Sequence, residues 1–152
     1  LMLSFPHLYS KAPKVPDGYY LDFSNAPSPQ SINKLLGKCG FELHPPKKLA
    51  LALEKSDNFL SIFEEKTNKL TGFVRVTSDK GLNANLWDIS AEPGELQQVL
   101  ISVLIHRILK IIRKEMPGCS ISVASPEIAN SALKYHGFLI DPGGIRTMGL
   151  KI

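Results

Sequence analysis

Apolar and polar positions follow one another along the chain in two periods, which together predict a mixed α/β domain. Short stretches rich in β-branched and aromatic residues predict strands at 19–23, 59–65, 70–77, 85–91 and 120–124. Apolar residues spaced by three and four predict helices at 29–39, 46–56, 96–115 and 126–135. A turn at 141–144 separates 138–140 from 146–152, and this arrangement predicts a terminal hairpin.

Cap residues set the boundaries of these elements. Ser28 followed by Pro29 is typical of a helix start, and Gly40 is typical of a helix end. The proline-rich stretch 1–18 shows no period and predicts an extended arm. The remainder, 19–152, has the length of one domain with one sheet, covered by helices on both faces.

Composition narrows the class of protein. The chain has 152 residues, of which 43% are hydrophobic and 21% charged, and these fractions are typical of a folded globular domain rather than a disordered one. No apolar run reaches the ~18 residues of a membrane span, and the short apolar start lacks a signal-peptide cleavage site. The two cysteines and four histidines show no metal-ligand spacing, so no metal site is expected.

Several segments in the second half of the chain carry a family resemblance. They are 72–79, 83–88, the pair Glu92-Pro93, 136–138, and 141–145 together with Met148. Over about residues 70–149 the chain resembles the cyanobacterial and plastid branch of the GNAT (GCN5-related) N-acetyltransferases. The order of predicted elements extends that resemblance toward residue 19. It implies the GNAT acyl-CoA N-acyltransferase fold, and a location in the cytoplasm or the plastid stroma.

The resemblance also implies a cofactor site and a reaction. In the family, acetyl-CoA lies between two parallel strands that splay apart, which here are 85–91 and 120–124. Backbone N–H groups of Ile89, Ser90 and Ala91 would then stabilise the negative charge on the thioester oxygen. The start of the long helix, at Gln98, Val99 and Leu100, would hold the pyrophosphate. An amine attacks the acetyl group, a carboxylate or water takes its proton, and a tyrosine protonates the thiolate.

This chain departs from the family pattern at the pyrophosphate loop. The three family glycines are replaced by Gln97, Val99 and Ile101. The branched side chains of Val99 and Ile101 add bulk where a phosphate would pass, and Glu95 adds a negative charge that repels a pyrophosphate. The family tyrosine is displaced as well. Its position falls on Leu133, and Tyr135 follows two residues later, about 200° around a helix.

Six residues outside that loop are candidates for chemistry, and four of them have a structural alternative. Asp79 and Asp88 are candidate general bases, with turn formation and strand-end hydrogen bonding as the alternatives. Tyr135 is the candidate acid. The residues proposed to line a substrate pocket are Arg75, Asn83 and Trp87, although Trp87 would equally fill a core and Asn83 would equally organise a turn.

Three functions therefore remain open. The first is an N-acetyltransferase that transfers acetyl from acetyl-CoA to a small amine or a protein lysine. The second is a catalytically inactive GNAT-fold module for binding or regulation, either as a monomer or as a homodimer. The third is nucleic-acid binding, which a net charge of +4 allows but does not require. Basic residues on the long helix favour that third class only weakly, because positive charge stabilises a helix C-terminus in any case. They are Arg107, Lys110, Arg113 and Lys114.

Overall fold

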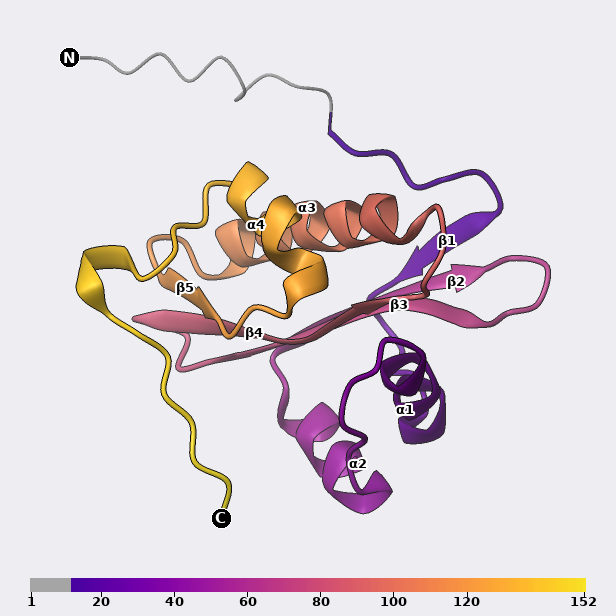
Figure 1. The fold of residues 1–152 in the computed structure, drawn as a ribbon, viewed down its shortest axis with the longest axis horizontal. Helices are drawn as coiled ribbons and strands as arrows, with labels where there is room; N and C mark the ends of the chain where they lie inside the picture. The colour runs from indigo at the N-terminus through magenta and orange to yellow at the C-terminus, as the bar shows by residue number, and fades with distance from the viewer. Residues whose placement is uncertain (1–11) are drawn as a thin grey trace.

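A five-stranded mixed sheet forms the centre of the protein in the computed structural model, which describes residues 12–152 (Figure 1). The strands lie side by side in chain order. The pairs β1–β2, β2–β3 and β3–β4 are antiparallel, and β5 runs parallel to β4. They are β1 (Tyr19–Asp22), β2 (Asn58–Glu64), β3 (Leu70–Ser78), β4 (Asn83–Ala91) and β5 (Ser120–Val123). The five predicted strands are confirmed to within two residues at each end.

Helices cover both faces of this sheet, as the sequence predicted. Figure 1 shows α3 and α4 on one face and α1 and α2 on the other. Their bounds are α1 (Pro29–Lys38), α2 (Pro46–Lys55), α3 (Gln97–Glu115) and α4 (Asn130–Tyr135). None of these helices is long and apolar enough to cross a membrane.

The start of α1 shows why the helix boundaries could be predicted. Ser28 Oγ accepts a hydrogen bond from the Ser31 amide at 3.1 Å, so the hydroxyl replaces a partner that the helix itself cannot supply. Gly40 adopts φ +76° just after the helix, a conformation that costs glycine little. A cap involves only residues close together in the chain, so the sequence alone suffices to predict it.

Two hydrophobic clusters hold the layers together. The larger one joins α3 to the inner face of the sheet, with Val103, Leu104 and Ile108 fully buried. The smaller one packs α1 and α2 onto the opposite face, around Phe73 on β3. Phe73 is the largest fully buried side chain of this cluster, so its contacts anchor α1 and α2 on the sheet.

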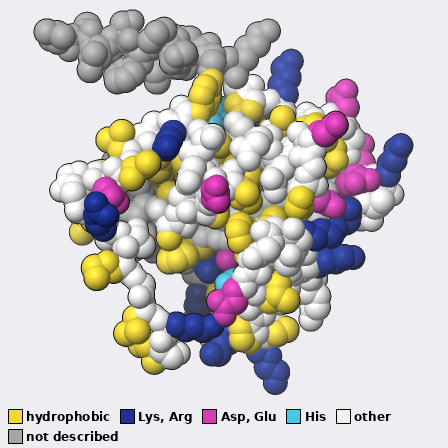
Figure 2. All heavy atoms as spheres, viewed as in Figure 1, with side chains coloured by type: hydrophobic (Ala, Val, Ile, Leu, Met, Phe, Trp, Pro, Cys, Tyr) yellow, Lys and Arg dark blue, Asp and Glu magenta, His cyan; other side chains and the backbone are white. Residues whose placement is uncertain are grey.

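The predicted terminal hairpin is wrong. Pro142–Gly144 forms a single 3-10 turn that follows Asp141 in a left-handed conformation, and residues 145–152 contain no strand. Figure 2 shows hydrophobic side chains standing out along this C-terminal segment.

The helix expected at 126–135 is also broken, into a 3-10 turn at Glu127–Ala129 and α4. The expected arm 1–18 lies partly outside the described residues, and its part from 12 to 18 forms no helix or strand.

Replacing Phe73 with alanine should destabilise the protein strongly. Removing a fully buried phenylalanine costs about 3–5 kcal/mol, because the lost transfer energy adds to an unfilled cavity. Urea unfolding followed by circular dichroism measures the effect. Phe23→Ala is the matched control, because Phe23 is 58% exposed and its loss should cost about 0.5 kcal/mol or less. Equal losses in the two variants would contradict the packing described for Phe73.

Candidate active site

β4 and β5 separate partway along their length. They pair from Asn83 opposite Ser120 to Leu86 opposite Val123, where β5 ends. β4 continues to Ala91 and keeps its pairing with β3 on the other side. Residues 87–91 therefore present one backbone edge that no strand within residues 12–152 covers. The carbonyls of Asp88 and Ala91 are bound by side chains of the chain itself, and the amides on this edge have no strand partner in that range.

An extra residue in β4 lies at the point of separation. Phe73 pairs with Ser90 and Arg75 pairs with Trp87, so β4 spends three residues where β3 spends two. This is a β-bulge, and bulges bend the strand that contains them. Asp88, inside the bulge, adopts φ +57°, a left-handed conformation that aspartate tolerates better than most residues. The bulge turns β4 away from the line that β5 follows.

The Asp88 carboxylate binds two side chains from different elements. Arg75 Nε donates to Asp88 Oδ2 at 2.6 Å, and His44 Nε2 lies 2.8 Å from Asp88 Oδ1. The Asp88 side chain is only 12% exposed, so the pair with Arg75 is shielded from solvent. With both oxygens engaged, Asp88 is placed to orient other groups. The structure thus brings the candidate residues Asp88 and Arg75 together at the separation of the strands.

Sequence reasoning missed His44. It lies in the connection between α1 and α2, and its backbone makes two hydrogen bonds with the Asn33 side chain: the His44 amide donates to Oδ1 at 3.0 Å, and the His44 carbonyl accepts from Nδ2 at 2.8 Å. The only signal in the sequence is that His44 stands directly before Pro45-Pro46, so that its backbone is already restricted at the helix start. Its partner Asp88 is distant in the chain.

Trp87 lies on the surface of the sheet beside this cluster. It is 41% exposed, so the interpretation that it fills the core is wrong. The guanidinium of Arg75 lies 5.7 Å from the centre of the indole ring, and the indole N–H donates to Thr77 Oγ1 at 2.7 Å. These contacts fix the ring in one orientation, and an apolar surface results next to Asp88.

The start of α3 has backbone amides without hydrogen-bond acceptors in the described part of the chain. No side chain caps this helix, and the first helical bond runs from the Leu100 amide to the Leu96 carbonyl. The amides of Gln98 and Val99 therefore have no hydrogen-bond acceptor among the residues the structure describes. Leu100 is buried and its amide is used within the helix, so it offers nothing to a ligand.

Two glutamines fill part of the space around these amides. Gln97 Nε2 donates to the Ala91 carbonyl at 2.9 Å, and Gln98 Nε2 donates to the Ile128 carbonyl at 3.0 Å. The first bond closes the loop back onto the end of β4, where the Cys39 thiol donates to the same carbonyl. Burial raises the pKa of Cys39, so this thiol is not poised as a nucleophile.

The replaced glycines differ in their consequences. Val99 is 41% exposed and stands at the helix start, where its branched side chain narrows the approach to the amides. Ile101 is fully buried in the main core, so the expectation that it too obstructs a phosphate is wrong. Glu95 precedes α3, and the first turn of the helix has no acidic residue.

Glu92 anchors the loop that leads to α3. Its Oε1 accepts hydrogen bonds from Lys69 at 2.9 Å and from Lys38 at 3.1 Å. Burial alone would raise the pKa of Glu92, but these two hydrogen bonds outweigh it and hold the pKa below its ordinary value. The loop is thereby fixed to the turn between β2 and β3 and to the end of α1.

Asp79 and Asn83 lie at the far end of β4, away from the separation. Asp79 Oδ1 accepts from the amides of Gly81, Leu82 and Asn83, so the turn interpretation fits this residue. The Gly81 amide, followed by those of Asn83 and Leu82, lowers the pKa of Asp79 and weakens it as a base. The Asn83 amide group donates to the hydroxyls of Ser120 and Ser122, which ties β4 to β5 rather than lining a pocket.

Tyr135 ends α4 and is half exposed, with its ring edge-on to the His136 ring at 5.3 Å between centres. The preceding Leu133, which occupies the position expected for the family tyrosine, is buried in the main core. The two side chains thus point in different directions, as the helical spacing requires. Tyr135 does not line the large cavity next to α4.

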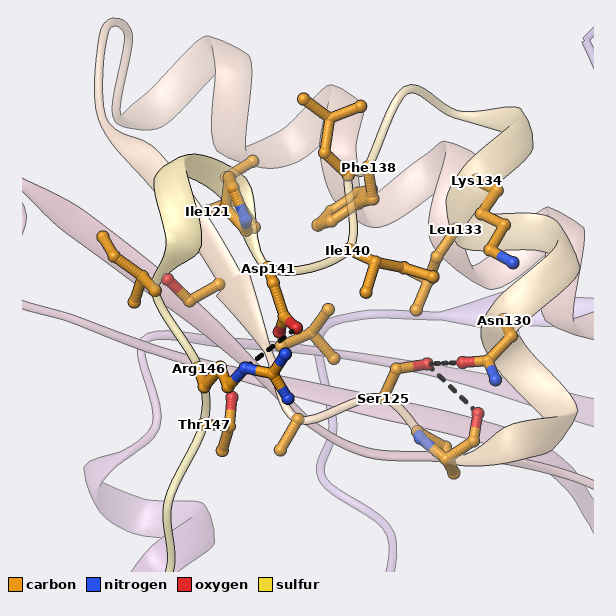
Figure 3. A pocket seen from close by; sticks show the side chains of 17 residues that line it. Ile121, Ser125, Asn130, Leu133, Lys134, Phe138, Ile140, Asp141, Arg146 and Thr147 are labelled. Atoms are coloured by element: carbon orange, nitrogen blue, oxygen red, sulfur yellow. Dashed lines mark hydrogen bonds and ion pairs between the residues drawn. The ribbon is translucent and has the colours of Figure 1, made fainter.

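That cavity lies along the outer edge of β5 (Figure 3). Its volume is about 720 Å³, and no residue of β4 or α3 lines it. Figure 3 shows Arg146 and Thr147 on one side of the cavity, with Leu133 and Lys134 of α4 on the other. It is the space left beside β5 because residues 146–152 do not pair there, and it is separate from the cluster around Asp88.

Within residues 12–152, no group of three or more histidine, cysteine, aspartate or glutamate side chains lies close enough to hold a metal ion.

Relatives of the chain identify its family. It is 34% identical over 131 residues to the N-acetyltransferase ycf52 of Gracilaria tenuistipitata var. liui, which covers 85% of this chain and 71% of the relative. This chain belongs to the GNAT N-acetyltransferases. It is also 28% identical over 118 residues to the chloroplastic GCN5-related N-acetyltransferase 1 of Arabidopsis thaliana, covering 77% of this chain and 59% of that protein. No family model matches the sequence.

Solved structures confirm the GNAT fold. A probable acetyltransferase from methicillin-resistant Staphylococcus aureus superposes with a TM-score of 0.79, covering 88% of this chain and 99% of that one at 17% identity. The GNAT assignment and the mixed sheet with helices on both faces are therefore both confirmed.

Restoring glycine at positions 99 and 101 should have unequal effects on stability. Ile101→Gly removes a buried side chain and a helix former, and should cost about 3 kcal/mol or more. Val99→Gly removes a half-exposed side chain at the first turn and should cost under about 1 kcal/mol. Urea unfolding of both variants measures the difference. Similar losses would contradict the assignment of Ile101 to the core.

The Asp79 carboxylate should stabilise the β3–β4 turn only when it is ionised. Its pKa is lower in the folded protein than its ordinary value of 3.8, so its contribution is present above that value and is lost as the pH falls through the folded pKa. Asp79→Ala should therefore reduce unfolding free energy at about pH 6 more than at about pH 2.5. Urea unfolding at both pH values tests this, and an equal loss at both would exclude the charge-dependent hydrogen bonds.

Proposed function

We propose that this GNAT protein transfers an acetyl group from acetyl-CoA to a primary amine. The observation that carries the proposal is the separation of β4 from β5 at the Asp88 bulge. It leaves the backbone edge of residues 87–91 without a strand partner among residues 12–152, so that the amides facing this edge are fixed in place before any ligand arrives. Donors that need no rearrangement favour the developing negative charge of an acyl transfer over the neutral thioester.

The residues at the start of α3 fit the phosphates of acetyl-CoA. The unpaired amides of Gln98 and Val99 point along the helix axis at its positive end, which is a general anion-binding arrangement. Acetyl-CoA would supply the activated acetyl group, while Ile89, Ser90 and Ala91 would contribute backbone groups, because the side chain of each is buried.

The acceptor would approach from the face of the sheet that carries α1 and α2. Trp87, Arg75 and Asp88 all lie there, and the exposed indole offers an apolar surface for the carbon skeleton of an amine. A small arylalkylamine and a lysine side chain both fit this description. The relative named as chloroplastic supports the plastid stroma as the place of action.

A second candidate function is an inactive module that keeps the fold and binds either another protein or a second copy of the chain. The hydrogen bonds of Gln97 and Gln98 favour it, because they satisfy within the chain groups that a working loop would offer to a ligand. Val99 favours it for the steric reason given above. This function requires neither acetyl-CoA binding nor transfer.

Calorimetric titration with acetyl-CoA separates the two functions. A transferase should bind acetyl-CoA with a micromolar Kd, which corresponds to about 8 kcal/mol of binding free energy. The Kd for 3′-dephospho-CoA is measured beside it, and a difference between the two values gives the contribution of the 3′-phosphate. Val99→Gly should tighten binding, since it clears the approach to the amides. Val99→Asp should weaken it at least about tenfold, while the added charge keeps the helix start stable.

The binding result decides the next step. If wild-type protein binds, release of free thiol from acetyl-CoA is measured with an arylalkylamine and with a lysine peptide. Absence of binding at millimolar ligand in both the wild type and Val99→Gly would overturn the transferase proposal. Sedimentation analysis would then test self-association as the remaining function.

A further inference from the structure

His44 is held in one position by contacts at both its ends. The Asn33 side chain on α1 binds the backbone amide and the carbonyl of His44, and these two bonds hold the His44 backbone in place. The imidazole is fixed separately by Asp88 on β4, at 2.8 Å. Its side chain remains 37% exposed, so the ring is anchored and yet reachable from solvent. Three elements thus converge to place one exposed imidazole.

The contacts of Asp88 decide which ring nitrogen carries the proton. The guanidinium of Arg75 donates to Oδ2 at 2.6 Å in an ion pair, and the carboxylate of that pair is a hydrogen-bond acceptor at both oxygens. His44 Nε2 must then donate to Oδ1, and a neutral imidazole with its proton on Nε2 keeps its lone pair on Nδ1. Within residues 12–152, no hydrogen bond reaches Nδ1. The lone pair is therefore available to an incoming group.

We propose that His44 is the catalytic proton acceptor for the amine, an inference that rests on the proposed acetyl transfer. Asp88, Arg75 and Asn33 are then positioning residues that hold the imidazole and set its tautomer. The placement supports the role, because Asp88 follows by two residues the last pair between β4 and β5. His44 thus lies beside the strand separation, on the face from which the acceptor approaches.

The proposed step balances as a simple acyl transfer. The amine nitrogen uses its lone pair to form a bond to the acetyl carbon, and His44 Nδ1 takes the proton that the nitrogen loses. The bond from carbon to sulfur breaks with its electron pair on sulfur. The imidazolium then returns its proton to the thiolate or to water, and His44 is neutral again. The charge that His44 carries between these events is stabilised by Asp88.

The test compares His44→Gln with His136→Gln. A glutamine at position 44 can still donate to Asp88 through its amide but has no basic lone pair, so folding and positioning are preserved while proton uptake is lost. We expect kcat for amine acetylation to fall about 10²–10⁴-fold, with the Kd for acetyl-CoA unchanged within about twofold. His136 is bound to the Ala132 carbonyl at the end of α4, away from the site, and its substitution should leave kcat within about twofold.

Two positioning variants and one spectroscopic measurement complete the design. Asp88→Asn and Asn33→Ala should lower kcat at least about tenfold with a smaller effect on the Kd for acetyl-CoA. Nitrogen NMR of the imidazole, which needs no turnover, should show His44 protonated on Nε2 in the wild type and a changed tautomer distribution in Asp88→Asn. Circular dichroism verifies that each variant is folded.

The outcomes are distinguishable from failure of the transferase proposal itself. If the wild type transfers acetyl groups and His44→Gln keeps kcat within twofold, the role of His44 is overturned while the transferase proposal stands. A wild-type imidazole protonated on Nδ1 overturns it as well. If the wild type neither binds acetyl-CoA nor transfers acetyl, both proposals fall together.

Discussion

One extra residue in β4 determines the arrangement of the candidate site. Without the bulge at Asp88, β4 would continue flat beside β3, and its side chains would alternate regularly to the end of the strand. With it, the strand bends away from β5 and leaves a free backbone edge, and Asp88 turns its carboxylate toward Arg75 and His44. The left-handed backbone at Asp88 is unfavourable by itself. The ion pair with Arg75 and the bond with His44 offset that cost.

The two cores on opposite faces of the sheet make this arrangement rigid. The main core fixes α3, and hence the free amides at its start, relative to the end of β4. The smaller core around Phe73 fixes α1 and α2, and hence the connection that carries His44. A donor site and an acceptor site on opposite faces of one sheet can meet only where the sheet opens. In this protein the opening lies between β4 and β5.

The start of α3 shows how a fold can persist while the chemistry of one loop changes. The helix keeps its position, its uncapped amides and its positive end, although the family glycines have gone. Ile101 was absorbed into the core, and Gln97 and Gln98 found carbonyl partners within the chain. Val99 alone places new bulk in the approach. Compared with a glycine loop, the backbone of the helix start is kept, and the approach of a ligand to its amides is narrowed by Val99.

The sequence by itself determined the features that depend on neighbours along the chain. The strands, the helices and the Ser28 cap followed from periodicity and from cap chemistry, which act over a few residues. The resemblance led to the correct family and to the correct pair of separating strands. Asp88 and Arg75 were named as candidate residues from the sequence, but the contact between them was not predicted.

Tertiary structure decided everything that depends on distant residues. The terminal hairpin failed because pairing of 146–152 requires a partner edge that local alternation cannot guarantee. The sequence could not reveal that Ile101 points inward while Val99 points outward, because the orientation of α3 on the sheet settles that. It also could not join His44 to Asp88, which are 44 residues apart. Only the packing of α1 and α2 against β3 brings them together, since side-chain hydrogen bonds form over a few ångströms of space and are indifferent to separation along the chain.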